Sequence, residues 1–239
     1  MLADLTIAAG GLPGGVPAPW LLAGATGHVL AEFDDAWTLL SAVERDRAAA
    51  FRFTADRDDF IAAHVLARSC AARLLDVAPT AVAIAQRCDV CGGEHGRPYV
   101  VEQPGTYVSW SHARGYVAAG AAMVPISVDV EVLGHDRLDE HLLDSVFTGA
   151  DVAAVKAAAY PEQVFLLQWA RKECLIKLGL ANLDTVRHVE LTGLPVEPDS
   201  LPGRWQSWRD GMHVLSWWDG TRHAVGAAVK LVPQRSELR

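Results

Sequence analysis

The sequence predicts a mixed α/β (α+β) fold of two similar subdomains, each a small antiparallel sheet packed with helices. Two stretches of the 239-residue chain, 108–122 and 215–229, read as β-hairpins of matching pattern, with Ser-Trp ahead of the turn and small apolar residues after it. Because hairpins in general share composition, coincidence is the alternative explanation of the match. A real repeat predicts halves at residues 1–123 and 124–239, with a ligand site between them.

The first half reads as a strand, two helices and a hairpin. Residues 27–33 read as the strand. Residues 34–53 read as a helix that opens with acidic residues and ends among arginines, and residues 56–77 read as a second helix. After a loop, residues 106–123 hold two strand-like runs on either side of an Arg-Gly turn.

The second half reads as a strand, three helices and a second hairpin. The strand covers residues 125–134, where Val alternates with polar residues. Helical patterns follow at residues 136–147, 150–160 and 165–180. Residues 212–232 read as a hairpin turned at an Asp-Gly pair, which is a strong hairpin signal.

Charge and hydropathy exclude several classes of protein. The formal net charge is −8, so the chain lacks the basic stripe that nucleic-acid binding requires. No apolar run reaches membrane-spanning length, and the Gly- and Pro-rich N-terminus lacks the basic start of a signal peptide. We therefore expect a cytoplasmic protein that binds neither nucleic acid nor membranes, and we expect it to be a monomer.

The four cysteines are too few for the disulfide scaffold of a secreted protein of this size. Cys88 and Cys91 form a Cys-x-x-Cys motif that is followed by His95. A structural zinc site normally needs four ligands, and the other two cysteines, Cys70 and Cys174, lie in predicted helices. We expect Cys88 and Cys91 to shape a loop without binding zinc, and structural zinc is the alternative.

The helical stretch at residues 165–180 carries three charges among apolar residues. A helix advances about 100° per residue, so Glu173 and Lys177 share a face with Trp169, and Lys172 lies about 60° to the other side of Trp169. Such placement favours charges that point into a site. The alternative is an ordinary surface pair of Glu173 with Lys177, which contributes roughly 0.2–0.5 kcal/mol.

Two acids stand on one face of the strand at 125–134. Alternation directs Asp129 and Glu131 to one side and the valines between them to the other. Carboxylates about 7 Å apart repel by roughly 2 kcal/mol at an effective dielectric near 20, and a bound cation removes this cost. Oxygen ligands of this kind suit Mg²⁺. The alternative is a strand edge with two solvated acids.

Ser111 and His112 are neighbours at the end of a predicted strand. Adjacent strand residues point to opposite faces, so the two cannot act as a nucleophile and its base. His112 either donates to an anionic ligand or is a structural histidine.

Four motifs follow one another along the chain: Gly96-Arg97-Pro98, Ser111-His112, Asp129-x-Glu131 and Trp169-x-x-Lys172-Glu173-x-x-x-Lys177. In this order and at these separations they resemble the 4'-phosphopantetheinyl transferases of the larger, pseudo-dimeric type, which activate polyketide and peptide synthetases. The last motif is the specific one, because "WARKECLIK" fits the family pattern W-x-x-K-E-[small]-x-x-K.

The chain departs from the family pattern at three positions. Ser127 stands where the G-x-D-x-E motif usually has glycine, and Ala113 stands where a second serine is common. Arg97 replaces a frequent lysine and keeps its charge.

The resemblance implies a Mg²⁺ site made by Asp129, Glu131 and Glu173 together with the pyrophosphate of coenzyme A. It implies that Lys172 and Lys177 face that pyrophosphate. Glu173 and Lys172 would be catalytic.

The resemblance also implies a nucleotide side in the first half. Ser111 and His112 would contact coenzyme A, with His112 donating to a phosphate and counted among the catalytic residues. Arg45 and Arg47 lie where the family binds the 3'-phosphate of coenzyme A. Arg97 and Pro98 would border its adenine.

The implied activity is transfer of 4'-phosphopantetheine from coenzyme A to a serine of an apo acyl or peptidyl carrier protein in fatty acid, polyketide or nonribosomal peptide biosynthesis. The serine would attack the phosphorus that bears pantetheine and release adenosine 3',5'-bisphosphate. Either Glu173 or a metal-bound hydroxide beside it would take the serine proton. The alternatives are a non-catalytic protein that binds coenzyme A and one that binds carrier proteins.

Overall fold

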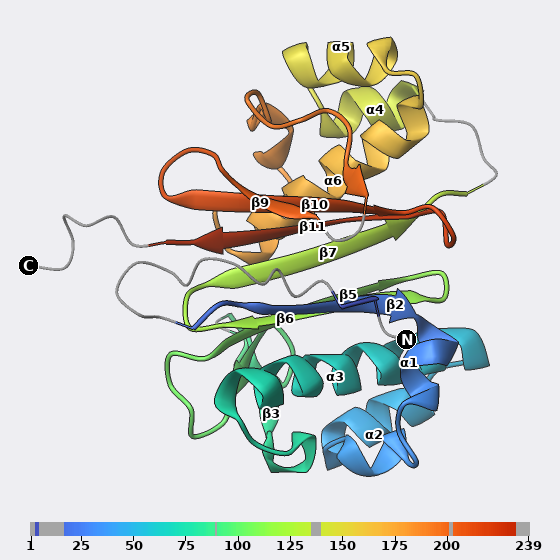
Figure 1. Ribbon diagram of the computed structural model, residues 1–239, viewed down its shortest axis with the longest axis vertical. Helices are drawn as coiled ribbons and strands as arrows, with labels where there is room; N and C mark the ends of the chain where they lie inside the picture. The colour runs from blue at the N-terminus through green and yellow to red at the C-terminus, as the bar shows by residue number, and fades with distance from the viewer. Residues whose placement is uncertain (1–2, 5–16, 89, 135–139, 201–202, 233–239) are drawn as a thin grey trace, which may run out of the picture. The chain divides into compact units, whose positions relative to one another are not determined.

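The computed structural model describes residues 3–4, 17–88, 90–134, 140–200 and 203–232 (Figure 1). The chain divides into two compact units, Met1–Ile126 and Ser127–Arg239, here called unit 1 and unit 2. Helices and small, mainly antiparallel sheets make up both units, so the predicted mixed α/β class is confirmed. None of the described helices is both long enough and apolar enough to cross a membrane.

The main sheet of unit 1 has four antiparallel strands in the order β1-β2-β6-β5. Their bounds are β1 Ala3–Asp4, β2 Trp20–Ala25, β5 Tyr107–Ala113 and β6 Tyr116–Ala122. Every residue of β6 is buried, and five of the seven are Ala or Gly. Such small side chains let the helix α3, Thr54–Leu75, lie close along one face of the sheet, as Figure 1 shows. The β5–β6 hairpin and α3 were both predicted from the sequence.

The expected strand at residues 27–33 is wrong, because this stretch forms the helix α1, Thr26–Ala31. Its buried residues, Thr26 and Val29, are three positions apart, which is a helical spacing. The Thr26 hydroxyl donates to the carboxylate of Asp59 on α3, and this tie fixes the start of the helix. The strand of this region lies upstream, in β2.

The single helix expected at residues 34–53 is also wrong. It is divided into a 3₁₀ turn, η1, at Ala36–Leu39 and the helix α2 at Ala42–Ala49. Ser41 and Glu44 form a reciprocal capping box that starts a new helix at this point.

A second, two-stranded antiparallel sheet in unit 1 joins β3, Ile84–Arg87, to β4, Arg97–Val100. The 3₁₀ turn η2, Pro79–Ala81, precedes it. The loop between β3 and β4 carries the Cys-x-x-Cys motif.

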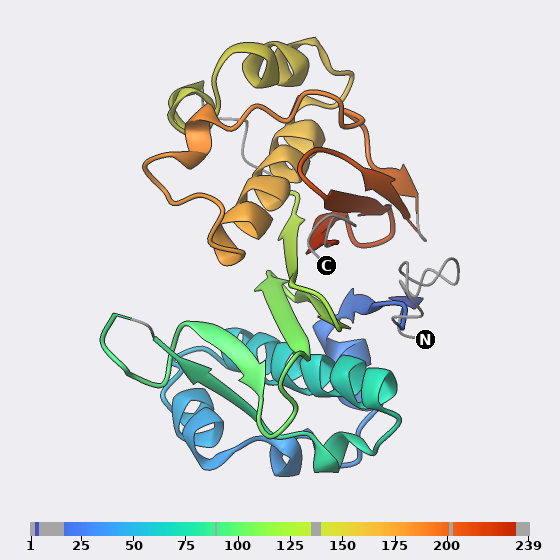
Figure 2. The ribbon, with the colours of Figure 1, turned by 90° about the vertical axis from the view of Figure 1, so that its left-hand side faces the viewer.

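Unit 2 holds a five-stranded sheet in which β7, β11, β10 and β8 follow in that order and β9 also pairs with β10. The bounds of these strands are β7 Ile126–Val132, β8 Asp199–Ser200, β9 Arg204–Ser207, β10 Met212–Asp219 and β11 Ala224–Leu231. The helix α6, Pro161–Lys177, packs against β11 (Figure 2). The helices α4 Glu140–Val146 and α5 Gly149–Ala157 and the 3₁₀ turn η3 Val186–His188 complete the unit. The sequence predicted β7, the β10–β11 hairpin and the three helices, but residues 136–139 of the expected α4 lie outside the described residues.

The two units repeat one strand order. In each unit a strand from the start of the unit pairs with the second strand of a hairpin, which pairs with the first. The order is β2-β6-β5 in unit 1 and β7-β11-β10 in unit 2. The register repeats too, since Trp110 lies opposite Ala119 and Trp217 lies opposite Gly226. In each unit the long helix places a cysteine against the second hairpin strand: Cys70 Sγ is 3.4 Å from an Ala119 carbonyl oxygen, and Cys174 Sγ is 3.4 Å from that of Ala227.

Candidate functional site

The acidic strand and the charged helix of unit 2 meet at Asp129 and Lys177. Alternation along β7 buries Val128 and Val130 and brings Asp129 to the face toward α6, where its exposed fraction is only 5%. The Lys177 Nζ atom lies 2.7 Å from Asp129 Oδ1 and 2.9 Å from the Val128 carbonyl oxygen. The last turn of α6 is thereby fastened to the middle of β7.

Glu173 is half-buried, and the charges of Asp129 and Lys177 both act on its carboxyl group. Burial raises the pKa of its carboxyl, the negative charge of Asp129 raises it further, and Lys177 lowers it. Burial is the largest single effect on the pKa of Lys177 and would lower it, but the charge and hydrogen bond of Asp129 together with the charges of Cys174 and Glu173 leave that pKa raised. The Lys177 side chain is 31% exposed, so this group of charges borders solvent.

Lys172 does not join this group, contrary to our expectation. Its side chain has no exposed surface, and its ammonium lies 3.3 Å from Asp151 Oδ2 of α5. It also donates to the carbonyl oxygens of Val146 at 3.2 Å and Val186 at 3.1 Å, and it lies 4.7 Å from the ring centroid of Phe147. Burial lowers the pKa of Lys172, and Asp151 opposes that effect. In this conformation Lys172 holds α4, α5 and η3 to α6 and presents no charge to a ligand.

The three carboxylates expected to bind Mg²⁺ are of the right chemical type for that ion. Their oxygen atoms, however, are too far apart in this structure to bind one ion together. Asp129, Glu131 and Glu173 offer the oxygen ligands that Mg²⁺ prefers, and the pKa of Glu173 is raised first by burial and then by the negative charge of Asp129. In the part of the chain that the structure describes, however, they do not form a group with ligand atoms within 4.8 Å of one another. Asp129 is buried, and Glu131 and Glu173 are partly buried.

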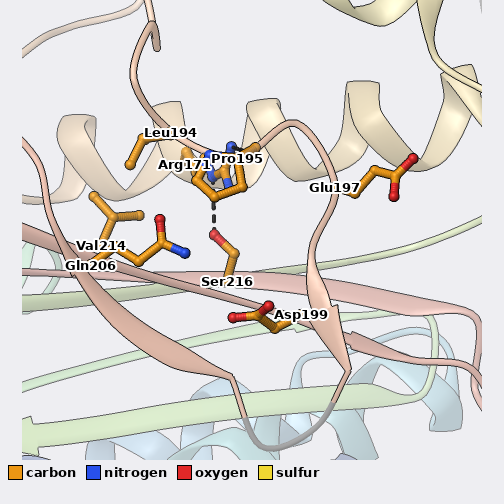
Figure 3. A pocket seen from close by; sticks show the side chains of 8 residues that line it. All are labelled: Arg171, Leu194, Pro195, Glu197, Asp199, Gln206, Val214 and Ser216. Atoms are coloured by element: carbon orange, nitrogen blue, oxygen red, sulfur yellow. Dashed lines mark hydrogen bonds between the residues drawn. The ribbon is translucent and has the colours of Figure 1, made fainter.

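A fully buried arginine next to the motif lysine was missed from the sequence. Arg171 donates to Ser216 Oγ at 3.0 Å, to the Pro195 carbonyl oxygen at 2.8 Å and to Gln168 Oε1 at 3.1 Å. Burial lowers its pKa to about 10, and Asp151 opposes that effect. The cavity beside it, drawn in Figure 3, has a volume of about 10 Å³. This is space for one water molecule, so the role of Arg171 is to tie α6 to β10.

On unit 1 the structure brings Arg47 to the same corner as the Gly96-Arg97-Pro98 motif, whose Arg97 and Pro98 begin the strand β4. Arg47 on α2 donates to Gln86 Oε1 on β3 at 2.8 Å, and Gln86 donates to the Gly96 carbonyl oxygen at 2.9 Å. Pro98 lies opposite Gln86 in the β3–β4 register, and the neighbouring Arg97 is exposed. Sequence reasoning missed Gln86, whose position in a short strand gave no signal.

The remaining predicted residues of unit 1 are Arg45 on α2 and the neighbours Ser111 and His112 on β5. Arg45 donates to the Leu40 carbonyl oxygen at 2.8 Å, so it closes the start of its own helix. Ser111 and His112 are at the end of β5, opposite Ala118 and Val117 of β6, and His112 is exposed. As neighbours on a strand they face opposite sides of the sheet.

A buried charged cluster joins α2 to α3 and was also missed. Glu44 Oε2 accepts from Arg68 at 2.6 Å, and His64 Nε2 lies 3.9 Å from Glu44 Oε1. Burial lowers the pKa of His64 to about 4, although Glu44 raises it, so the imidazole is neutral at pH 7. These groups are internal to the helical layer and serve its packing.

The loop after β3 forms a third group of polar side chains. Cys88, Cys91 and His95 place one ligand atom each within 4.8 Å of one another. The sequence carried the signal in its Cys-x-x-Cys-x-x-x-His spacing, but we discounted it because a fourth ligand was missing.

Known proteins add no identification. No protein-family model matches the chain, and a search of the curated proteins finds no match.

Proposed function

We propose that the chain is a cytoplasmic, Mg²⁺-dependent 4'-phosphopantetheinyl transferase, which moves phosphopantetheine from coenzyme A to a serine of an acyl or peptidyl carrier protein. One observation carries the proposal. The two motifs that share the family pattern, the acidic strand β7 and the charged helix α6, meet at the 2.7 Å contact of Lys177 with Asp129, with Glu173 in their field.

In this reaction the carrier serine oxygen forms a bond to the phosphorus that bears pantetheine. The bond from that phosphorus to the bridging pyrophosphate oxygen breaks, and adenosine 3',5'-bisphosphate leaves. Glu173 takes the serine proton, and its raised pKa suits a general base, because a carboxylate with a pKa closer to neutral holds a proton better.

Lys177 supplies a fixed positive charge toward the pyrophosphate oxygens as negative charge develops on them. Its contact with Asp129 orients the ammonium, and its partial exposure leaves it accessible to a ligand. Asp129, Glu131 and Glu173 would hold Mg²⁺, which when bound neutralises pyrophosphate charge and polarises the attacked phosphorus.

The corner of unit 1 made by Arg47, Gln86 and the start of β4 at Arg97 and Pro98 supports a nucleotide-binding role. Its two arginines could bind a phosphate, which guanidinium groups recognise well. Lys172 has a structural role in this proposal.

The test is release of adenosine 3',5'-bisphosphate, quantified by chromatography after incubation with coenzyme A, Mg²⁺ and an apo carrier protein. We expect release by the wild-type chain and by Asp184→Asn, a control at an exposed acid of unit 2. We expect at least about a hundredfold loss for Asp129→Asn and for Glu173→Gln, with circular dichroism confirming that both are folded. Binding of coenzyme A without any release from wild type would contradict the proposal and favour the non-catalytic alternative.

A further inference from the structure

The loop between β3 and β4 gathers three metal-ligating side chains in unit 1. The ligand atoms of Cys88, Cys91 and His95 all lie within 4.8 Å of one another, and Cys91 Sγ is 3.0 Å from His95 Nε2. Neither cysteine is in a disulfide. Cys91 and His95 are exposed, and Cys88 is half-buried, so ions in solution can reach the group.

The backbone of the loop shapes this group. The Gly92 amide donates to the Cys88 carbonyl oxygen at 2.8 Å, and the Cys88 amide donates to the Gly93 carbonyl oxygen at 2.9 Å. Gly92 has φ +71°, a left-handed conformation that favours glycine. The Gly93 amide is 3.4 Å from Cys91 Sγ, and such a donor stabilises a thiolate.

The base of the loop is closed by Gly96. A Cβ atom at this position would come within 2.8 Å of the Arg87 carbonyl oxygen, and φ is +97°. Only glycine lets the chain pass this close to the end of β3. The two ends of the loop therefore lie next to each other, and all three ligands come from this one short segment.

The spacing of the ligand atoms fits a tetrahedral metal ion. Ligands at about 2.3 Å for sulfur and about 2.0–2.1 Å for nitrogen in a tetrahedron lie roughly 3.5–3.8 Å from one another. A shift of about half an ångström or slightly more in the exposed His95 side chain takes its 3.0 Å contact with Cys91 to that value. Two thiolates and an imidazole select a soft or borderline ion such as Zn²⁺ over Mg²⁺.

We propose that Cys88, Cys91 and His95 bind Zn²⁺, with water in the fourth position. This revises our expectation of a loop without zinc. In the described part of the chain no further Cys, His, Asp or Glu joins the group. Three protein ligands and an open position suffice for binding. The site uses none of the residues assigned to the transfer reaction, so it stands or falls independently of the proposed function.

The ion would staple the β3–β4 hairpin. A two-stranded hairpin is marginal on its own, and here the ligands bridge the connection between its strands. The two strands carry Gln86, Arg97 and Pro98, which form the corner with Arg47. Zinc binding should therefore order that corner as well as the loop.

Metal content and affinity test the proposal. The purified chain is analysed for zinc by mass spectrometry of the elements, then stripped with chelator and titrated with Zn²⁺ and, for its thiolate charge-transfer bands, with Co²⁺. The variants are Cys91→Ser and His95→Ala. The matched controls are Cys70→Ala, a buried cysteine of α3, and Glu94→Gln, an exposed acid in the same loop.

We expect one zinc per chain for wild type and both controls, thiolate-to-cobalt absorption in the same three proteins, and at least about a tenfold loss of zinc affinity in both ligand variants. We expect deuterium exchange of residues 84–100 to slow when zinc is added to the stripped wild type. Wild-type protein that binds no zinc at micromolar concentration, or carries a Cys88 to Cys91 disulfide in place of it, would overturn the proposal. Equal zinc affinity of the ligand variants and the controls would also overturn it. The measurement of zinc binding by wild type needs no variant, so a variant that fails to fold does not obscure the result.

Discussion

Lys172 and Lys177 stand five residues apart on α6 and have opposite environments. Lys177 pairs with Asp129 of β7 and is partly in solvent, whereas Lys172 is enclosed by α4, α5 and η3. The angle of each residue around the helix follows from its position in the sequence, and this was enough to place Glu173 and Lys177 on one face. It could not give the burial of Lys172, because that depends on Asp151, a residue in another helix.

Lys172→Met should strongly destabilise unit 2. The change keeps the length of the side chain but leaves the buried Asp151 carboxylate without its cation, for which losses of about 3–5 kcal/mol are typical. Lys156→Met, at an exposed lysine of α5, should change the free energy of unfolding by about 0.5 kcal/mol or less. Urea unfolding measures both. Equal stability of the two variants would show that the Lys172 contacts contribute nothing to folding.

Glu173 should make stability fall with rising pH. Its folded pKa is raised above the ordinary 4.5, so between 4.5 and the raised value the folded chain binds more protons than the unfolded chain. The ionised carboxylate is thus disfavoured in the fold, and this destabilisation is absent below pH 4.5 and complete above the raised pKa. Glu173→Gln should gain stability relative to wild type as pH rises through that window.

Urea unfolding of wild type and Glu173→Gln from pH 4 to pH 8 checks this prediction. Glu162→Gln, at an acid of the first turn of α6, serves as the comparison on the same helix. A stability difference between wild type and Glu173→Gln that does not change with pH would contradict the raised pKa.

At the scale of elements, the sequence predicted those with strong patterns. The helix α3 agrees with expectation because its helical pattern extends over 22 residues. The strand β7 agrees because valine alternates regularly with polar residues along it. The helix α1 did not, because a stretch of six residues is too short to show a distinctive period, and Thr26 at its start is tied to Asp59 on α3. The break before α2 was readable in Ser41 and Glu44, a capping-box spacing that we did not use.

Gly226→Ala should destabilise the β10–β11 pair. A Cβ atom at Gly226 would come within 2.0 Å of the ring of Trp217, which is fully buried opposite it. Overpacking of this kind costs typically about 1–3 kcal/mol, so the melting temperature should fall by several degrees. Gly27→Ala is the control, since its Cβ atom would meet nothing within 4 Å and Ala favours the helix α1. A melting temperature unchanged by Gly226→Ala would show that the Trp217 ring can move aside.

At the scale of the whole chain, the repeated strand order could be read only faintly from the sequence. The two hairpins share Ser-Trp and small residues, and the structure adds that each is flanked by an earlier strand and covered by a long helix with a buried cysteine. This common order of strands is found in addition to the shared composition. The motifs of the candidate site were readable because they are local, whereas the ties that hold them, such as Arg171 to Ser216 and Arg47 to Gln86, join distant segments.

The measurement that tests the central claim most directly is the intact mass of an apo carrier protein after incubation with this chain, coenzyme A and Mg²⁺. The account predicts that the carrier gains the mass of one phosphopantetheine on its serine, that excess chelator abolishes the gain, and that Glu173→Gln slows it at least about a hundredfold while remaining folded. No mass gain on any of a set of acyl and peptidyl carriers, or an undiminished gain with Glu173→Gln, would contradict it.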